Sequence, residues 1–311
     1  MGGATAVVDF RPVGLGFTSI ETLVLHDGSY SSGGSVTRSA TVTFDASQLT
    51  GGSAALPLDL QVVGDTGTET INVLMSGPGS VNLSGWTFSS WSPATDVIAV
   101  ADTGRADSII GSNQSDRLNG AGGADVLDGQ AGDDRIVYDA TDIAIASGLG
   151  VDTLVVTGAA TIDLSSADQT AGDSANVSGF ENVDASDSAA AVSIIGSGGA
   201  NVLTGGTGAD TITGGAGHDL SNGGLGNDVF VFGPGSGNDT IAGFDANLAT
   251  GQDLLDISAF GITAANFGAR VSVTDLGADT RVTIDGSDTI ALLGVDGNGQ
   301  NVITQGDFIL A

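Results

Sequence analysis

The chain has 311 residues, of which 51 are glycine, and its 37 acidic residues against seven basic ones give a net charge of −30. This charge disfavours nucleic acid and anionic membranes as partners and favours cations. The lack of cysteine excludes disulfides and thiolate metal sites, and no apolar run of 18 residues predicts a membrane span. Residues 1–17 do not combine a basic segment with a long apolar core, so a Sec signal is not expected.

Residues 1–101 consist of short apolar runs, such as "IETLVLHD" and "LPLDLQVVGD", that alternate with turn signals. Alternation of this kind also suits a sandwich or a barrel. A right-handed parallel β-coil accommodates both these runs and the shorter repeats that follow. We therefore expect a β-solenoid-like region over 1–101.

Two arrays of nine-residue units come next, over 102–137 and 196–245, separated by a β-rich spacer at 138–195. Typical units are "GAGGADVLD" (120–128), "GGTGADTIT" (205–213) and "GGLGNDVFV" (223–231). Each unit has a glycine-rich turn, an acidic or amide residue at its sixth position and a strand-like triplet with an apolar centre. Ser221 occupies the apolar position of its unit, which predicts the weakest core position of the second array.

The spacing predicts a cation site between stacked turns. Two units form one coil of 18 residues, so each turn stacks on the turn two units later. Glycine lets turn carbonyls point inward, and the aspartates add carboxylates, which gives about six hard oxygen ligands in flexible geometry. Such a ligand set indicates calcium rather than magnesium or zinc. The predicted pairs are Asp107 with Asp125, Asp116 with Asp134, Asp210 with Asp228 and, as a weaker site, Asn201 with Asp219.

The turn glycines complete the predicted ligand set, because their carbonyls would face the ions. In the first array, only two units keep the glycine at the fourth position. For the looser sites at Asp107 and Asp116, a solvated turn without an ion is the alternative. The glycines concerned are Gly123, Gly132, Gly205, Gly206, Gly208, Gly214, Gly215, Gly217, Gly223, Gly224 and Gly226.

The C-terminal region, 246–311, has a different pattern. Residues 256–268 could carry a short helix, and residues 271–295 alternate with period two between the turn signals "GA" and "DGSD". This alternation predicts antiparallel hairpins. A hairpin cap has a physical motive, because an open parallel edge is an aggregation hazard.

The nonads resemble the repeats-in-toxin (RTX) family of bacterial proteins exported by type I secretion. The segment "GNDTIAGFDANLATGQDLLDISAFG" (237–261) is similar to the segment after the arrays of that family. The resemblance implies calcium-binding roles for Asp239, Asp245, Asp253 and Asp256. It also implies a calcium β-roll fold, an uncleaved C-terminal secretion signal, the type I secretion machinery as a partner and an extracellular location. The lack of lysine and cysteine resembles bacterial surface-layer proteins.

An enzymatic role is not expected, and neither catalytic residues nor a cofactor besides calcium are predicted. The chain has two histidines, His26 and His218, and contains no H-E-x-x-H or G-x-S-x-G motif. We expect a structural role at the cell surface, with self-assembly or a cell-surface polysaccharide as the partner. Two alternatives remain open: a secretion and folding tail of a longer RTX adhesin or toxin, and a secreted polysaccharide-acting enzyme on the solenoid of residues 1–100.

Overall fold

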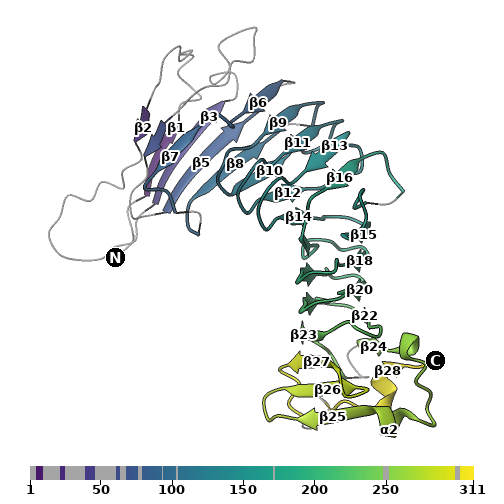
Figure 1. Ribbon diagram of the computed structural model, residues 1–311. Helices are drawn as coiled ribbons and strands as arrows, with labels where there is room; N and C mark the ends of the chain where they lie inside the picture. Colours follow the sequence, from purple (N-terminus) through teal and green to yellow (C-terminus); the bar gives the residue numbers. More distant parts are fainter. Residues whose placement is uncertain are drawn as a thin grey trace, which may run out of the picture. The chain divides into compact units, whose positions relative to one another are not determined.

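The computed structural model describes the strands at 5–9, 22–24, 39–45 and 61–63 and then residues 68–311, except 76–78, 93, 103, 171, 248–251 and 298–301. Much of the predicted solenoid region 1–101, including most of the segment examined for a signal, therefore lies outside the described residues. The chain forms two compact units, Met1–Thr153 with Asp173–Gly179, and Leu154–Gly172 with Phe180–Ala311. In the described residues, both consist of short stacked strands with very little helix (Figure 1).

The first unit is a stack of parallel strands arranged in sheets. Every strand pair in it is parallel, and each strand pairs with the strand one coil away. One sheet contains, in spatial order, β1 (Thr5–Asp9), β3 (Ser39–Asp45), β5 (Thr68–Leu74), β8 (Val97–Ala101), β10 (Asp116–Asn119) and β12 (Arg135–Val137). A second contains β6 (Ser80–Asn82), β9 (Ser108–Ile110), β11 (Val126–Asp128), β13 (Ala144–Ala146) and β16 (Asn176–Ser178), and a third contains β2 (Thr22–Val24), β4 (Gln61–Val63) and β7 (Thr87–Ser89).

The second unit repeats this plan and ends in an antiparallel addition. β14 (Thr153–Val155) lies at the boundary of the units. One sheet contains β17 (Asn182–Asp184), β19 (Val202–Thr204), β21 (Leu220–Asn222), β23 (Asn238–Ala242), β27 (Asp288–Leu293), β26 (Thr280–Ile284) and β25 (Val271–Asp275) in that order. The other contains β15 (Thr161–Asp163), β18 (Ser193–Ile195), β20 (Thr211–Thr213), β22 (Val229–Val231), β24 (Leu254–Asp256) and β28 (Phe308–Ile309).

The 18-residue coil explains the register and the core. Leu127 pairs with Ile109 on one side and Ile145 on the other, and Ile212 pairs with Ile194 and Phe230. The middle residue of each triplet therefore falls in one inward column, and its neighbours face outward because a strand alternates its side chains. All of the apolar triplet centres of the two arrays are buried. This confirms the all-β parallel solenoid of the β-roll type.

The predicted antiparallel cap is confirmed at the C-terminal end. β25 pairs with β26 and β26 with β27 in antiparallel register, whereas β27 pairs with β23 in parallel. The parallel coil continues beyond residue 245, since β24 pairs with β22 and β28 pairs with β24. Three short helices accompany this part: η2 (Ser258–Phe260), α2 (Phe267–Arg270) and η3 (Gln305–Asp307). None of the helices in the described part of the chain is long and apolar enough to cross a membrane.

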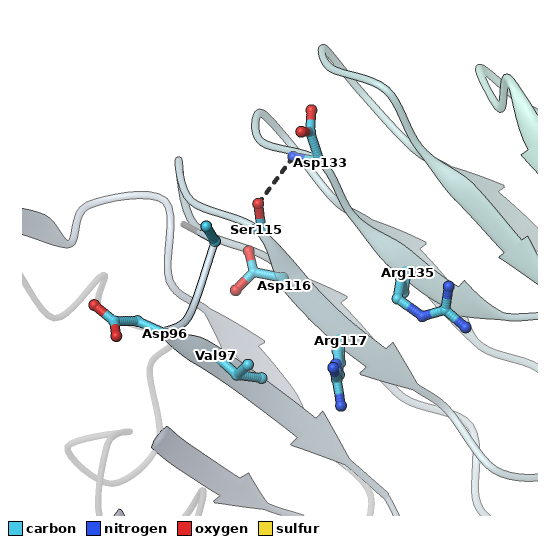
Figure 2. A pocket seen from close by; sticks show the side chains of 8 residues that line it. Asp96, Val97, Ser115, Asp116, Arg117, Asp133 and Arg135 are labelled. Carbon is cyan, nitrogen blue, oxygen red and sulfur yellow. Dashed lines mark hydrogen bonds between the residues drawn. The ribbon is translucent and has the colours of Figure 1, made fainter. Parts of the chain in front are cut away.

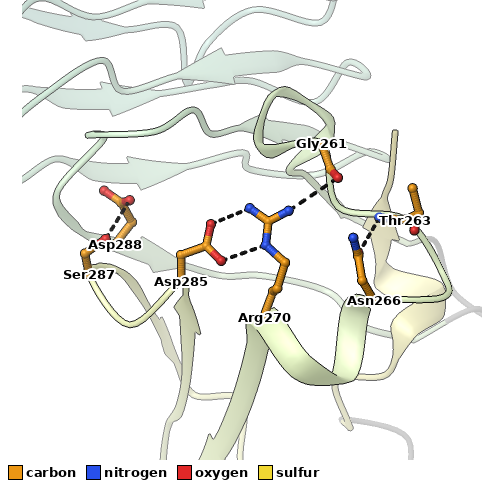
Figure 3. Close-up of polar contacts among 7 residues, drawn as sticks. All are labelled: Gly261, Thr263, Asn266, Arg270, Asp285, Ser287 and Asp288. Carbon is orange, nitrogen blue, oxygen red and sulfur yellow. Dashed lines mark hydrogen bonds and ion pairs between the residues drawn. The ribbon is translucent and has the colours of Figure 1, made fainter.

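A bidentate ion pair between Arg270 and Asp285 connects the C-terminal cap to α2 (Figure 3). The Arg270 side chain donates from Nε and Nη2 to the two carboxylate oxygens of Asp285, at 2.8 and 2.6 Å. Its Nη1 donates to the carbonyl of Gly261 at 3.4 Å. The ion pair raises the pKa of Arg270 and lowers that of Asp285. Because Asp285 is exposed and Arg270 is only half-buried, the pair orients the β26–β27 turn and contributes little to stability.

Ser221 lies at the core position that the sequence singles out. It pairs with Leu203 on β19 and with Ile241 on β23, and its side chain is buried. We expect Ser221→Val to raise the free energy of unfolding in calcium by about 1 kcal/mol, because it buries extra apolar surface. A thermal melt followed by circular dichroism measures this change. Thr211→Val, on the exposed face of β20, is the matched control, and an equal gain there would contradict the assignment.

Candidate metal centre

The turns of the second array can be formed only by glycine at several positions. Gly224 and Gly226 have φ angles of 92° and 135°, in the region that disfavours other residues. A Cβ atom at Gly224 would collide with the carbonyl oxygen of Gly206, one coil earlier. At Gly223 the added atom would overlap the carboxylate of Asp228. The glycines thus leave room for the carbonyls and carboxylates of stacked turns to lie close together.

The aspartates at the sixth positions form a ladder along each edge of the coil. Where two units of an array stack, one carboxylate oxygen accepts a hydrogen bond from the backbone N–H of the sixth-position residue one coil earlier. The predicted partners are all brought together in this way: Asp107 N–H donates to Asp125 at 2.8 Å, Asp116 N–H to Asp134 at 2.8 Å, Asp210 N–H to Asp228 at 2.8 Å, and Asn201 N–H to Asp219 at 2.9 Å.

The second carboxylate oxygen of many ladder members has no hydrogen-bond partner although it is buried. This is true of Oδ2 of Asp107, Asp125, Asp134, Asp142, Asp219 and Asp228. A buried polar atom without a partner costs free energy, and native proteins rarely retain one without a reason. A hard divalent cation would supply the missing partner. Two ladder members differ, because their second oxygen has a hydrogen-bond partner. Oδ2 of Asp116 accepts the N–H of Ser112 at 2.6 Å, and Oδ2 of Asp210 accepts the N–H of Gly206 at 2.7 Å.

Burial makes these carboxyl groups reluctant to ionise in the absence of a cation. Loss of hydration raises the pKa of Asp134 to about 8, assisted by the charges of neighbouring aspartates. Burial likewise raises the pKa of Asp116 and Asp228 to about 7, although backbone hydrogen bonds oppose the rise. The pKa of Asp219 is raised by the same cause. A bound cation would offset the lost hydration and keep the groups ionised at neutral pH.

The N-terminal end of the first array brings three carboxylates together. Asp102, Asp107 and Asp125 each offer an oxygen, and these oxygens lie within 4.8 Å of one another. Burial raises the pKa of Asp107 to about 6, with Asp102 as the next contributor. The structure therefore gives the looser site at Asp107 a richer acidic environment than its turn sequence suggests.

Of the four aspartates that the family resemblance singles out in 237–261, two extend the ladder. Asp239 accepts from Asp219 N–H at 3.0 Å, and Asp253 accepts from Asp228 N–H at 2.9 Å. Asp245 lies beside Asp253 and donates its N–H to that carboxylate at 2.9 Å. Asp256 lies outside the ladder, because it accepts the N–H of Ser258 at 2.9 Å at the start of η2.

The ladder also contains residues that the sequence reasoning missed. Asp134 N–H donates to Asp152 at 2.8 Å, and Asp125 N–H donates to Asp142 at 3.3 Å. Asp152 ends the turn "SGLGVD" (147–152), whose glycines and 18-residue offset from Asp134 were a usable signal. Asp142 follows Asp125 by 17 residues in a turn without glycine, so no such signal marks it. Asp96 occupies a similar place further toward the N-terminus, where it accepts Glu69 N–H at 3.1 Å.

The geometry as a whole presents rows of hard oxygen donors at a regular spacing. Carboxylates and turn carbonyls of this kind, held in a flexible backbone, are the ligands that calcium prefers. The set contains no sulfur ligand, because the chain has no cysteine. The residues present therefore fit a series of calcium ions, in which each ion would be held between two stacked turns.

Comparison with known proteins agrees with this chemistry. Residues 103–136 and 195–230 match the RTX calcium-binding nonapeptide repeat, in four copies. Repeats of this type bind calcium, so the predicted resemblance and the predicted ion are both confirmed. A search of curated proteins found no match. Among solved structures the chain is similar to the extracellular lipase LipA from Serratia marcescens, with 18% identity and a TM-score of 0.27. The similarity covers 78% of this chain and 45% of that one, less than half of the lipase.

Proposed function

We propose that this chain, whose nonads are RTX calcium-binding repeats, is an extracellular structural protein that folds when calcium binds. The observation that carries the proposal is the ladder of buried aspartates whose second oxygens have no hydrogen-bond partner. Such a core is costly without cations and favourable with them. The protein's work is then to be a calcium-dependent scaffold.

The ladder aspartates and the turn carbonyls are the proposed ligands. In the second array, each ion would lie between the turn of one coil and the turn of the next, with Asp210 and Asp228 serving one edge and Asp219 and Asp239 the other. Asn201 would weaken its site, because its amide brings no negative charge. Asp142 and Asp152 extend the proposed sites beyond the first array.

Folding controlled by calcium also suits export of an unfolded chain. Calcium is scarce in a cytosol and plentiful outside, so the repeats would remain unfolded before export, when the acidic charges repel one another, and fold afterwards. We propose export by type I secretion, with the secretion signal in 246–311. The proposed destination is the cell surface, where copies of the chain assemble in the manner of a surface layer.

Electron microscopy of the purified protein with and without calcium tests the assembly role. Ordered lattices or filaments that form in calcium and disperse in EGTA are the expected result. Persistent monomers in calcium, with the β-sheet signal intact, would contradict assembly and favour the alternative of a folding tail of a longer protein. A count of bound ions by calcium titration, made on the same preparation, tests the metal sites independently of assembly.

A further inference from the structure

A pocket of about 190 Å³ opens on the first unit and borders the ladder at Asp116. Its lining comes from three neighbouring coils: the turn before β8 together with the first residue of that strand, and the starts of β10 and β12 (Figure 2). The lining residues that carry the argument are Asp96, Ser115, Arg117, Asp133 and Arg135.

Two arginines of this lining are neighbours across strands. Arg117 on β10 pairs in register with Arg135 on β12. Their backbones therefore lie about 4.8 Å apart, and their side chains leave the same face of the sheet. Like charges directly opposite each other destabilise a sheet. The chain has only seven basic residues in total, and it places two of them here. An anionic group that lies between the two guanidinium groups would offset this repulsion and would be attracted to both.

Arg117 is exposed, and it has no hydrogen-bond or ion-pair partner among the described residues. Figure 2 shows its side chain extended from β10 and away from the carboxylate of Asp116. Guanidinium groups bind carboxylates and phosphates through paired N–H donors, which makes arginine the favoured residue for such anions.

The three acidic residues of the pocket differ in their hydrogen-bond partners. Asp96 is buried and accepts the N–H groups of Glu69 and Ser92, at 3.1 and 2.6 Å. Asp116 belongs to the calcium ladder. Asp133 is exposed and uses its Oδ1 to accept Val151 N–H at 2.9 Å, which leaves Oδ2 as a further hydrogen-bond acceptor. Ser115 adds a hydroxyl, which accepts Asp133 N–H at 3.2 Å.

We propose that this pocket binds an anionic sugar, whose carboxylate or phosphate lies between Arg117 and Arg135 and whose hydroxyl groups hydrogen-bond to Asp133 and Ser115. The combination of positive donors with neighbouring carboxylate and hydroxyl groups suits a sugar acid better than a bare anion. Calcium on Asp116 and Asp134 removes negative charge beside the pocket, so the sugar binds more tightly to the calcium-loaded protein. That calcium dependence rests on the proposed metal sites, and it adds a ligand to the proposed surface role.

Isothermal titration in 5 mM calcium chloride, with glucuronate, glucose 6-phosphate and glucose as probes, tests the site. Saturable binding of either anionic sugar, and none of glucose, is expected, and the better of the two identifies the anionic group. Arg117→Gln with Arg135→Gln should weaken that binding at least about tenfold, as loss of charged hydrogen bonds predicts. Arg281→Gln, which alters an exposed arginine on β26, is the matched control and should leave it unchanged.

Circular dichroism distinguishes a failure of the sugar site from a failure of calcium-dependent folding. If the wild-type protein folds in calcium but binds neither anionic sugar, or if the double arginine variant binds as tightly as wild type, the pocket assignment is wrong and the calcium-dependent fold stands. If the protein folds without calcium, the proposed function is wrong, and titration of the folded protein with the same sugars still decides the pocket assignment.

Discussion

Removal of calcium with EGTA at pH 7.5 is expected to abolish the β-sheet circular-dichroism signal and to expand the chain. The physical reason is the ladder, in which burial raises the pKa of Asp134 to about 8 and that of Asp228 to about 7, so that at this pH folding requires such carboxyl groups either to bind a proton or to ionise without a counterion. With a dissociation constant of about 0.1 mM and about 1 mM calcium, each ion contributes roughly 1.4 kcal/mol. Six ions would then contribute on the order of 8 kcal/mol, which is comparable with the whole stability of a typical domain.

A pair of matched variants locates this effect in the ladder. Asp228→Asn keeps an oxygen to accept Asp210 N–H but removes the negative charge, so a calcium titration of folding should shift to higher calcium. Asp256→Asn changes a half-buried aspartate outside the ladder and should leave the titration in place. A spectrum unchanged by EGTA would refute calcium-dependent folding, and equal shifts in the two variants would refute the role of the ladder.

Acid is expected to stabilise the calcium-free fold. The folded-state pKa of Asp116, Asp142 and Asp228 is raised to about 7 by burial, from an ordinary value of 3.8. Between these values the folded state binds more protons than the unfolded state, so calcium-free stability falls as the pH rises from about 4 to 7. Protein freed of calcium on a chelating resin should therefore show more β-sheet circular-dichroism signal at pH 4.5 than at pH 7.5, where the calcium-free chain is expected to be unfolded. In calcium the dependence reverses, because protons compete with the metal.

A neutral replacement distinguishes this effect from relief of the general negative charge. Asp134→Asn should stabilise the calcium-free protein at pH 7.5 and flatten its pH dependence, because the side chain no longer ionises in a buried position. Asp187→Asn, at an exposed position, removes the same charge and should raise the calcium-free β-sheet signal much less. If both variants gain equally, self-repulsion rather than burial governs the response to acid.

The coil could be predicted from the sequence because its 18-residue period is marked by glycine and aspartate residues that few other residue types can replace. Glycine at turn positions with positive φ and an aspartate 18 residues from the next one define the stacking, and the pairs Asp107–Asp125 and Asp210–Asp228 follow from it. The antiparallel cap was predictable for a similar reason, because its strands alternate with a period of two.

The remaining parts depend on information that the repeat does not contain. Asp142 joins the ladder through a turn that is one residue shorter and has no glycine, so only the folded coil brings it to Asp125. Asp256 was expected among the ion ligands by family resemblance, yet it follows the inward Leu255 on β24, and alternation turns it outward. The pairing of Arg117 with Arg135 arises from strand register, which no motif records.

The polar core position at Ser221 has a consequence for how the stack comes apart. In a stack of coils each coil contacts only its neighbours, so local opening begins where both the core and the ion site are weakest. Ser221 lies directly beside Leu203 on β19, and β19 follows the turn in which Asn201 replaces an aspartate. Two deficits therefore meet in adjacent coils. We therefore expect local unfolding of the second array to begin in this stretch, so that hydrogen exchange and proteolysis occur there first as calcium falls.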